Sequence, residues 1–153
     1  MAQASVREAV VEDLDAILPF CTIEELLALQ ELAGKPVREI MSDEIKSDHR
    51  PWAGLIDGNP VCLFGCYPET LITGRVFVWL LGSRQLRKYP LLLSKYAAPL
   101  LRHMTRDYDE LVTLVDTRVP MTIRFAEWLG FRERDTIRPG LGPPYKSMEL
   151  RRH

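Results

Sequence analysis

The chain has 153 residues, and its 46% hydrophobic and 27% charged residues are proportions typical of a globular protein rather than a disordered one. This length fits a single domain, which we expect to cover residues 1–153. The formal net charge of -1 gives no overall attraction to nucleic acid or to an anionic membrane. No apolar stretch approaches the ~20 residues that span a bilayer, and the first residues lack the apolar core of a secretory signal. We therefore expect no membrane segment and no secretion by signal peptide.

Three cysteines, Cys21, Cys62 and Cys66, form the sparse, odd-numbered set that is typical of a reducing compartment. Cys62 and Cys66 would share one face of a strand, yet lie roughly 13 Å apart at ~3.3 Å per residue. That separation is too great for a disulfide or for a shared zinc ion. The three histidines are scattered, so we expect buried cysteines and no metal site.

The first third of the chain predicts one strand followed by helices. Residues 6–10 alternate as a strand does, and acidic residues then open a helix over 12–21. A second helix begins at the capping box Thr22-Ile23-Glu24-Glu25 and ends at Gly34. Another helical piece is expected within residues 36–47.

The middle of the chain predicts three consecutive strands. Residues 52–56 and 61–67 are strand-like runs joined by Asp57-Gly58-Asn59-Pro60, and Asp-Gly between two such runs is a strong hairpin signal. The third strand is expected over residues 75–81, in which residues 76–81 are apolar at both odd and even positions. A strand that is apolar on both faces is typical of the centre of a covered sheet.

The last predicted elements alternate between helix and strand. Pro99 falls inside the first of these helices and predicts a kink or a break, whereas Gly130 is well placed to end the second. The elements are a helix over 89–106, a strand over 111–115, a helix over 120–129, and strands over 131–137 and 145–150.

The resulting order, β-α-α-β-β-β-α-β-α-β-β, together with local signals, resembles the GNAT family of N-acetyltransferases. The signals are the first strand and helix over Ser5–Leu14, the hairpin at Asp57-Gly58, and the late helix Ile123-Arg124-Phe125-Ala126-Glu127-Trp128-Leu129-Gly130-Phe131. The resemblance covers nearly the whole chain. It implies an α/β (α+β) fold with a mixed sheet, in which strands 76–81 and 111–115 run parallel as neighbours.

In that family, acetyl-CoA lies where the central strand parts from its parallel neighbour, and its pyrophosphate binds amides at the start of the next helix. A helix N-terminus suits an anion because its N–H groups and its dipole both favour negative charge. The resemblance therefore implies cofactor-binding residues in two groups. Those beside the pantetheine are Trp79, Leu80, Leu81 and Gly82, and those beside the phosphates are Arg84, Arg87 and Lys88.

Two departures from the family pattern argue against efficient catalysis. The family's glycine-rich phosphate turn is replaced by Arg87-Lys88-Tyr89-Pro90-Leu91-Leu92, which has no glycine and loses one N–H at Pro90. The tyrosine that protonates the leaving thiolate in many members is replaced by Ala126, beside Phe125, and neither side chain can donate a proton. The frequent asparagine at the start of that helix is Val119 here. The basic turn could still attract a phosphate by charge, or simply be a solvated surface.

A carboxylate or a histidine would be needed to accept the proton of an attacking amine. The candidates for a catalytic base are Glu44, Glu69 and Asp116, with Asp48 and His49 as neighbours of the first. Each is also the kind of residue that stands on a surface or caps a turn. Asp116 follows a predicted parallel strand, where α/β sites tend to lie, but could simply cap the turn to the next helix.

A narrower resemblance is to the small GNAT-like proteins of tailed bacteriophages, including the internal virion protein A family of short-tailed phages. The matching segments are Val78-Trp79, Arg87-Lys88-Tyr89 and Ile123-Arg124-Phe125. This resemblance implies a phage or prophage gene, a place in the bacterial cytoplasm or in the virion, and protein partners that include other virion proteins.

Three functions stay open at this point. The two departures favour a degenerate GNAT domain that acts as a virion-associated structural or interaction protein and needs no cofactor. The alternative is an active N-acetyltransferase that uses acetyl-CoA through an unusual phosphate turn. A third function is the binding of CoA or a nucleotide as a regulatory ligand without catalysis.

Overall fold

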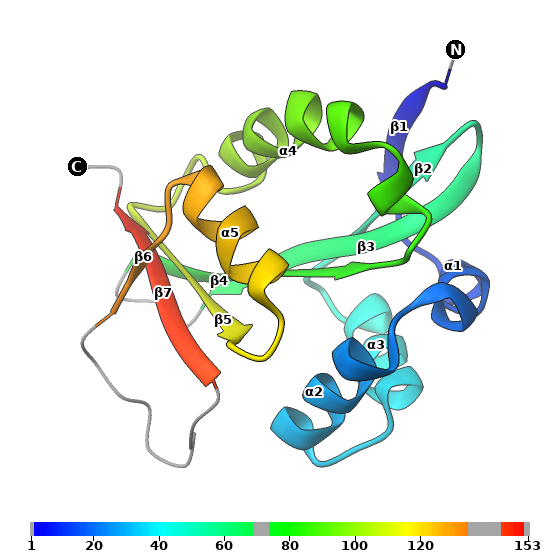
Figure 1. Cartoon of the computed structure of the whole chain (residues 1–153), viewed down its shortest axis with the longest axis horizontal. Helices are drawn as coiled ribbons and strands as arrows, with labels where there is room; N and C mark the ends of the chain where they lie inside the picture. The colour runs from blue at the N-terminus through cyan, green and yellow to red at the C-terminus, as the bar shows by residue number, and fades with distance from the viewer. Residues whose placement is uncertain (1, 69–73, 135–144, 152–153) are drawn as a thin grey trace. The chain divides into compact units, whose positions relative to one another are not determined.

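A computed structural model describes residues 2–68, 74–134 and 145–151 (Figure 1). The helices are α1 (Val11–Ile17), α2 (Ile23–Ala33), α3 (Val37–Lys46), α4 (Pro90–Met104) and α5 (Pro120–Leu129), with short 3₁₀ turns η1 (Leu18–Phe20) and η2 (Leu86–Lys88). The strands are β1 (Ala4–Glu8), β2 (Trp52–Ile56), β3 (Asn59–Pro68), β4 (Arg75–Gly82), β5 (Glu110–Asp116), β6 (Arg132–Glu133) and β7 (Tyr145–Arg151).

The seven strands form a mixed sheet in the order β1-β2-β3-β4-β5-β7-β6. The strands β4 and β5 pair parallel, as the sequence predicts, whereas β1–β2, β2–β3, β5–β7 and β6–β7 pair antiparallel. The chain divides into two compact units, one formed by Met1–Gly65 with Leu80–Tyr96, the other by Cys66–Trp79 with Ala97–His153. Each unit is described by itself below.

In the first unit, β1, β2 and β3 form an antiparallel meander (Figure 1). The hairpin turn between β2 and β3 has positive φ at Asp57 (51°) and Gly58 (81°), and Ile56 pairs with Asn59 across it. Two positive φ angles in a two-residue loop match the right-handed twist of the strands. The Asp-Gly hairpin predicted from the sequence is therefore confirmed.

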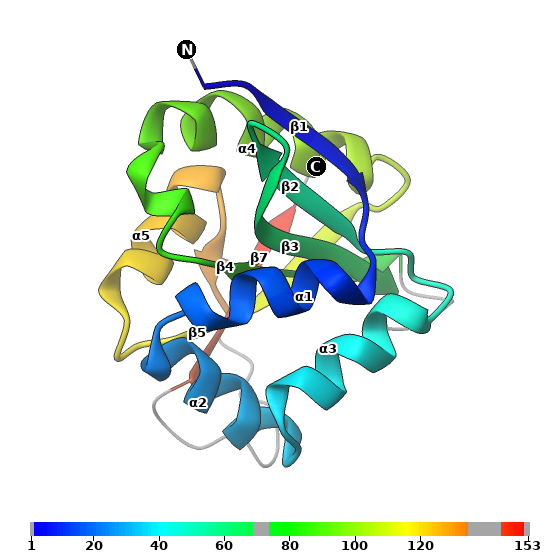
Figure 2. The same ribbon diagram turned by 90° about the vertical axis from the view of Figure 1, so that its right-hand side faces the viewer.

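The helices α1, α2 and α3 of the same unit lie beside one another, as Figure 2 shows. The start of α1 is fixed by Asp13, whose carboxylate accepts two 2.7 Å hydrogen bonds from Arg7 and a 2.9 Å bond from the backbone of Val10. Arg38 of α3 forms an exposed ion pair with Asp15 of α1 at 2.9 Å. These contacts tie β1 and α3 to α1.

In the second unit, α5 covers one face of the sheet, and Figure 1 shows it beside β5. Gly130 ends α5 with φ 107°, so its left-handed conformation confirms the predicted helix end. Half-buried side chains of α5, Ile123 and Leu129, pack on the core. The buried members of this core are Val76, Val78, Leu111, Val115, Ala126, Phe131 and Met148.

Several predicted boundaries differ from the structure. The first strand is residues 4–8 rather than 6–10, because Val10 is instead the N-cap of α1, where its N–H bonds to Asp13. The predicted helical piece after Pro36 is the ten-residue helix α3. Pro99 produces no break, since α4 runs through it.

Two further points concern the ends of predicted elements. Residues 135–137 of the strand predicted over 131–137 lie outside the described residues, and the described part contains the short strand β6. No helix within the described ranges is both long and apolar enough to cross a bilayer.

Candidate functional site

In the second unit, the parallel pairing of β4 with β5 covers three residue pairs and ends before Trp79. Their parallel register covers Arg75–Glu110, Val76–Leu111 and Phe77–Val112. Beyond these pairs, β4 continues to Gly82 and β5 to Asp116, and β5 stays paired with β7 along its whole length. The hydroxyl of Thr113 donates a 2.9 Å hydrogen bond to the carbonyl of Val78 and marks the point where the register ends.

The two faces of β4 differ at this point. Val76 and Val78 are buried in the core that α5 covers. Phe77 and Trp79 point to the opposite face, because side chains alternate along a strand. The ring of Phe77 stacks on Tyr67 with centroids 5.1 Å apart.

Trp79, one of the predicted pantetheine residues, carries a buried polar atom. Its indole Nε1 has no accessible surface of note and no hydrogen-bond partner among the described residues. Its neighbours Leu80, Leu81 and Gly82 complete β4 as members of the first unit. Leu80 is exposed and Leu81 is buried, so the predicted residues at the end of β4 alternate between surface and interior.

In the first unit, the turn after β4 is held by hydrogen bonds to distant segments. The buried Ser83 donates from its backbone (3.0 Å) and from its hydroxyl (2.7 Å) to the carbonyl of Val61 on β3. Arg84 donates from its backbone (2.8 Å) and from Nε (3.4 Å) to the carbonyl of Phe20 in η1. The predicted phosphate residue Arg84 is therefore engaged with the α1–α2 connection.

The next residues use most of their amides in the 3₁₀ turn η2. Leu86 donates to Ser83, Lys88 to Gln85 and Tyr89 to Leu86, at 3.1 to 3.2 Å, and Pro90 has no N–H. The first intrahelical bond of α4 is from Leu93 to Tyr89, so the amides of Leu91 and Leu92 precede it. These two amides, rather than a glycine-rich loop, stand where a helix N-terminus can meet an anion.

Side chains explain why this turn keeps its shape without glycine. Leu86, Tyr89 and Leu92 pack on a small core formed by Ile56, Val61 and Cys62. Arg87 and Lys88 instead remain exposed. The turn therefore exposes the positive charges of Arg87 and Lys88, while its apolar side chains pack in the core.

The carboxylate of Asp116, a candidate catalytic base, is held by hydrogen bonds from Arg118. This carboxylate accepts hydrogen bonds from the backbone and the guanidinium of Arg118 at 2.8 to 3.1 Å, and Arg118 also reaches the hydroxyl of Tyr145 at 3.3 Å. These bonds from Arg118 hold the pKa of Asp116 below its ordinary value, although its partial burial opposes them. A carboxylate with a lowered pKa is a weak proton acceptor, so the contacts favour a role in fixing the turn before α5.

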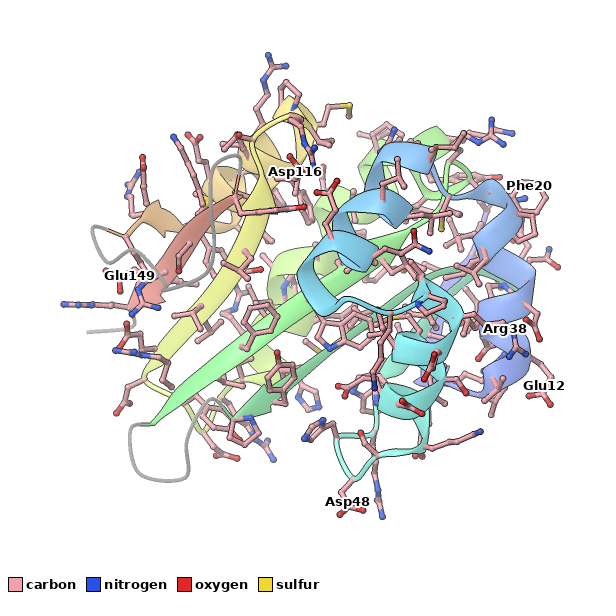
Figure 3. All side chains as sticks on the ribbon, turned by 90° about the horizontal axis from the view of Figure 1, so that it is seen from below. Glu12, Phe20, Arg38, Asp48, Asp116 and Glu149 are labelled. Atoms are coloured by element: carbon pink, nitrogen blue, oxygen red, sulfur yellow. The ribbon has the colours of Figure 1, made fainter. Side chains whose placement is uncertain are left out.

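Glu44, the second candidate, forms a pair with His49 at 3.0 Å from Oε1 to Nδ1, and His49 also lies at 3.1 Å from Oε2. Both belong to the first unit, at the end of α3 and in the connection to β2. Figure 3 shows Asp48 at one end of the layer that α1, α2 and α3 form, and Phe20 far from it. Glu69, the third candidate, lies outside the described residues.

Ala126, which the family resemblance places where many GNAT members carry a thiolate-protonating tyrosine, lies on α5. Ala126 is 6% exposed and packs in the core with Val78 and Val115. Its neighbour Phe125 stacks on Trp128 with centroids 6.1 Å apart. Neither side chain at this point of α5 can supply a proton.

Two features of this region cannot be predicted from the amino-acid sequence. The unpartnered N–H of Trp79 depends on its surroundings, since an apolar strand position does not reveal where an indole nitrogen points. The bond between Arg84 and Phe20 joins residues 64 positions apart and has no local signal. Within the described ranges, no group of three or more histidine, cysteine, aspartate or glutamate side chains could hold a metal ion.

No protein-family model and no curated protein matches the amino-acid sequence. Solved structures are nevertheless similar to the whole chain. Ard1 from Thermoplasma volcanium has a TM-score of 0.69 at 14% identity, covering 97% of this chain and 97% of that one. A PaiA N-acetyltransferase from Thermoplasma acidophilum, in complex with coenzyme A, has a TM-score of 0.66 at 15% identity, covering 97% and 99%.

A third similar structure is a GNAT superfamily phosphinothricin acetyltransferase from Sinorhizobium meliloti, in complex with AcCoA. It has a TM-score of 0.63 at 16% identity and covers 97% of this chain and 88% of that one. At identities this low, the similarity shows the fold but does not show an activity. Together with the observed strand order and the parallel β4–β5 pair, they show that the chain has the GNAT fold.

Proposed function

We propose that this protein is an acetyl-CoA-dependent N-acetyltransferase with an unusual phosphate turn. The observation that carries the proposal is the parting of β4 from β5 after the pair Phe77–Val112. A strand edge without a strand partner can hydrogen-bond an extended ligand, and pantetheine is an extended chain with two amide groups. Two of the similar structures hold coenzyme A or acetyl-CoA, which supports this ligand.

The pantetheine would run beside β4 from Trp79 towards Gly82, and the pyrophosphate would meet the turn that follows. The amides of Leu91 and Leu92 at the start of α4 and the exposed charges of Arg87 and Lys88 support an anion there. Arg84 would contribute mainly by holding the turn to Phe20.

In the proposed reaction, the amine nitrogen attacks the thioester carbon, so a C–N bond forms and the C–S bond breaks. The amine loses a proton and the CoA thiolate gains one. Ala126 cannot donate that proton, and Asp116 is held as a paired carboxylate by Arg118. If solvent water carries the protons in place of these two residues, turnover is expected to be slow and to rise with pH as the free amine becomes more abundant.

The alternative is a degenerate GNAT domain that serves as a structural or interaction protein. The observations that favour it are the amides consumed within η2, the missing N–H of Pro90 and the apolar side chain of Ala126. A phage origin, a place in a virion and virion partners stay predictions, since no comparison bears on them. The regulatory binding of CoA without turnover is the intermediate case.

Thermal unfolding with and without millimolar acetyl-CoA tests the proposal. A ligand at a hundred times its dissociation constant stabilises the native state by about 2.7 kcal/mol, so the melting temperature should rise. Release of free CoA in the presence of a panel of primary amines should follow. A melting shift without CoA release would favour regulatory binding, and the absence of both would favour the degenerate domain.

A pair of charge-reversal variants locates the phosphates. Lys88→Glu changes an exposed residue of the turn, whereas Arg102→Glu changes an exposed residue near the other end of the same helix α4. We expect Lys88→Glu to lower the affinity for acetyl-CoA severalfold and Arg102→Glu to leave it unchanged. Equal effects of the two variants would argue against a phosphate site at this turn.

A further inference from the structure

The surface of α3 carries a hollow of about 370 Å³. The described residues that line it all belong to the first unit, and they are Pro36, Arg38, Glu39, Ser42 and Asp43. A volume of this size lies at the lower end of the range for small-molecule sites, about 300–1,000 Å³. The hollow therefore has room for a small ligand.

Ser42 contributes a polar group to this hollow that the protein itself does not use. The residue is only 8% exposed, and it lines the hollow. Its hydroxyl makes no hydrogen bond with a residue of the described ranges. Most buried polar groups are paired, and a serine within a helix often bonds to the carbonyl one turn earlier. The hydroxyl oxygen of Ser42 is therefore available to whatever occupies the hollow.

Two carboxylates lie on the same side of α3 as Ser42. Glu39 precedes Ser42 by three residues and Asp43 by four, and side chains at these spacings are neighbours on a helix. Both carboxylates are exposed, and neither forms an ion pair with a described residue, Lys46 of the next turn included. Two like charges four residues apart destabilise a helix. A cation bound between them would offset this repulsion.

The charge of Arg38, the cation among the lining residues, is compensated by α1. Its Nε and Nη2 donate hydrogen bonds of 2.9 and 3.2 Å to the two carboxylate oxygens of Asp15. Figure 3 shows Arg38 beside α1, the helix that carries Asp15. The charge that remains at the hollow is therefore the negative charge of Glu39 and Asp43.

A primary ammonium group matches the three side chains on this side of α3. It is compact and has three N–H donors, and Glu39, Ser42 and Asp43 offer three acceptors. A guanidinium presents its donors in a flat fork that fits one carboxylate, whereas a quaternary ammonium has no N–H and is recognised by aromatic rings. No aromatic side chain is among the described residues that line the hollow.

A metal ion matches the hollow less well than an ammonium group. Ca²⁺ takes about six to eight oxygen ligands, and Mg²⁺ requires a nearly ideal octahedron. Two carboxylates and a hydroxyl fall short of both. The described part of the chain also has no group of three or more acidic, histidine or cysteine side chains that could hold a metal ion.

We propose that the hollow on α3 binds a small free alkyl amine in its ammonium form. The ammonium group lies between Glu39 and Asp43 and donates to the hydroxyl of Ser42, and the alkyl chain lies against Pro36. Primary alkyl amines are protonated at pH 7, as the lysine pKa of about 10.4 shows. An amine that attacks a thioester must be unprotonated, so an amine held here as a cation is a ligand and not the acetyl acceptor. The inference is therefore independent of the proposed acetyl transfer.

Two ligands of equal charge test the inference on the wild-type protein. Butylamine carries the ammonium group, and butyltrimethylammonium has the same chain and charge without an N–H. In ¹H–¹⁵N spectra recorded without acetyl-CoA, the amide resonances of Ser42 and Asp43 should shift saturably with butylamine. Butyltrimethylammonium should bind about tenfold more weakly, because it can make no hydrogen bond to the carboxylates. Equal affinities would mean an unspecific attraction of cations and would overturn the inference, as would the absence of saturation.

Two substitutions locate the bound ammonium group. Asp43→Asn removes one charge and Ser42→Ala removes the hydroxyl, and each should weaken butylamine binding by about fivefold. Asp48→Asn is the matched control, because Asp48 is an exposed aspartate after the end of α3 and is not among the residues that line the hollow. It should retain the wild-type affinity. An equal loss in Asp48→Asn and Asp43→Asn would contradict the site.

Blocked lysine, Nα-acetyllysinamide, distinguishes a free amine from a lysine side chain of a partner protein. It carries the same ammonium group on a butyl chain that ends in two peptide groups. A site for a free amine should bind it no more tightly than butylamine. Binding that is severalfold tighter would assign the hollow to a lysine of a partner protein and would overturn the inference. Because acetyl-CoA is absent from these titrations, their failure contradicts this inference alone, whereas the melting test with acetyl-CoA decides the proposed function.

Discussion

The hydroxyl of Thr113 on β5 donates a 2.9 Å hydrogen bond to the backbone carbonyl of Val78 on β4. It does so one residue beyond the last registered pair, Phe77–Val112. A side chain thus takes the place of a backbone partner at the point where two parallel strands separate. The proposed acetyl-CoA site depends on the part of β4 that follows this bond.

Replacing Thr113 by valine tests the importance of that bond. Valine keeps the branched shape but leaves the carbonyl of Val78 without its donor, and we expect a loss of about 1 kcal/mol in the free energy of unfolding. The stabilisation by acetyl-CoA should also decrease. Thr113→Ser, which keeps the hydroxyl, should retain most of both quantities in urea denaturation with and without ligand. Equal behaviour of the two variants would show that the hydroxyl is dispensable.

Gly130→Ala should destabilise the protein for two reasons. Gly130 has φ 107°, which an alanine adopts at a cost of about 1–2 kcal/mol, and an added Cβ would lie 3.1 Å from Leu150 Cδ1. Gly34→Ala is the matched control, since Gly34 has φ 69° and no atom within 4 Å of the added Cβ. Thermal or urea unfolding should show the larger loss for Gly130→Ala, and equal losses would mean that contact with Leu150 is harmless.

Gly54→Ala should destabilise the protein, because its added Cβ would clash with one neighbouring side chain. The added Cβ would stand 2.6 Å from Cys62 Sγ, and Cys62 is itself buried in the core of the first unit. Overpacking of this kind costs about 1–3 kcal/mol. Adding Cys62→Ala should restore part of the stability, so the two substitutions should be non-additive in a double-mutant cycle. Strict additivity would contradict the predicted clash.

Acid should weaken the start of α1 through Asp13. Burial pulls the pKa of Asp13 upward, but the hydrogen bonds from Arg7 and Val10 and the charge of Arg7 lower it by more, so the net shift is downward. A carboxylate whose folded pKa is lower than its unfolded value, about 3.9, stabilises the protein above that pH and loses this contribution as the pH falls further. Asp13→Asn should therefore cost about 2 kcal/mol at pH 7 and much less near pH 2.

Urea denaturation at both pH values measures this difference. Asp15→Asn serves as the control, because Asp15 forms an exposed pair with Arg38 and should contribute little at either pH. A loss of stability in Asp13→Asn that is independent of pH would contradict the role of the Asp13 charge.

The sequence predicts most of the fold because its signals there are local. Asp57-Gly58 specifies a hairpin turn by its backbone conformation, and Gly130 ends α5 for the same reason. The run over residues 76–81 is apolar on both faces, which is expected of a strand in the middle of a sheet. The first strand was misplaced because Val10 continues an alternating pattern, yet its N–H is bound by Asp13.

The candidate site is less predictable because its properties depend on distant contacts. The glycine-poor turn is visible in the sequence, but the hydrogen bond from Arg84 to the carbonyl of Phe20 is not. Asp116 was placed correctly at the end of β5, whereas its pairing with Arg118 makes it a weak base. The unpartnered nitrogen of Trp79 is a property of packing and appears only once the chain is folded.

Amide hydrogen exchange of β4 tests the central proposal most directly. If acetyl-CoA binds along the strand edge that parts from β5, the amides of residues 79–82 should exchange severalfold more slowly with saturating acetyl-CoA, while those of the β2–β3 hairpin should not change. Exchange along β4 that is identical with and without acetyl-CoA would contradict the proposed site.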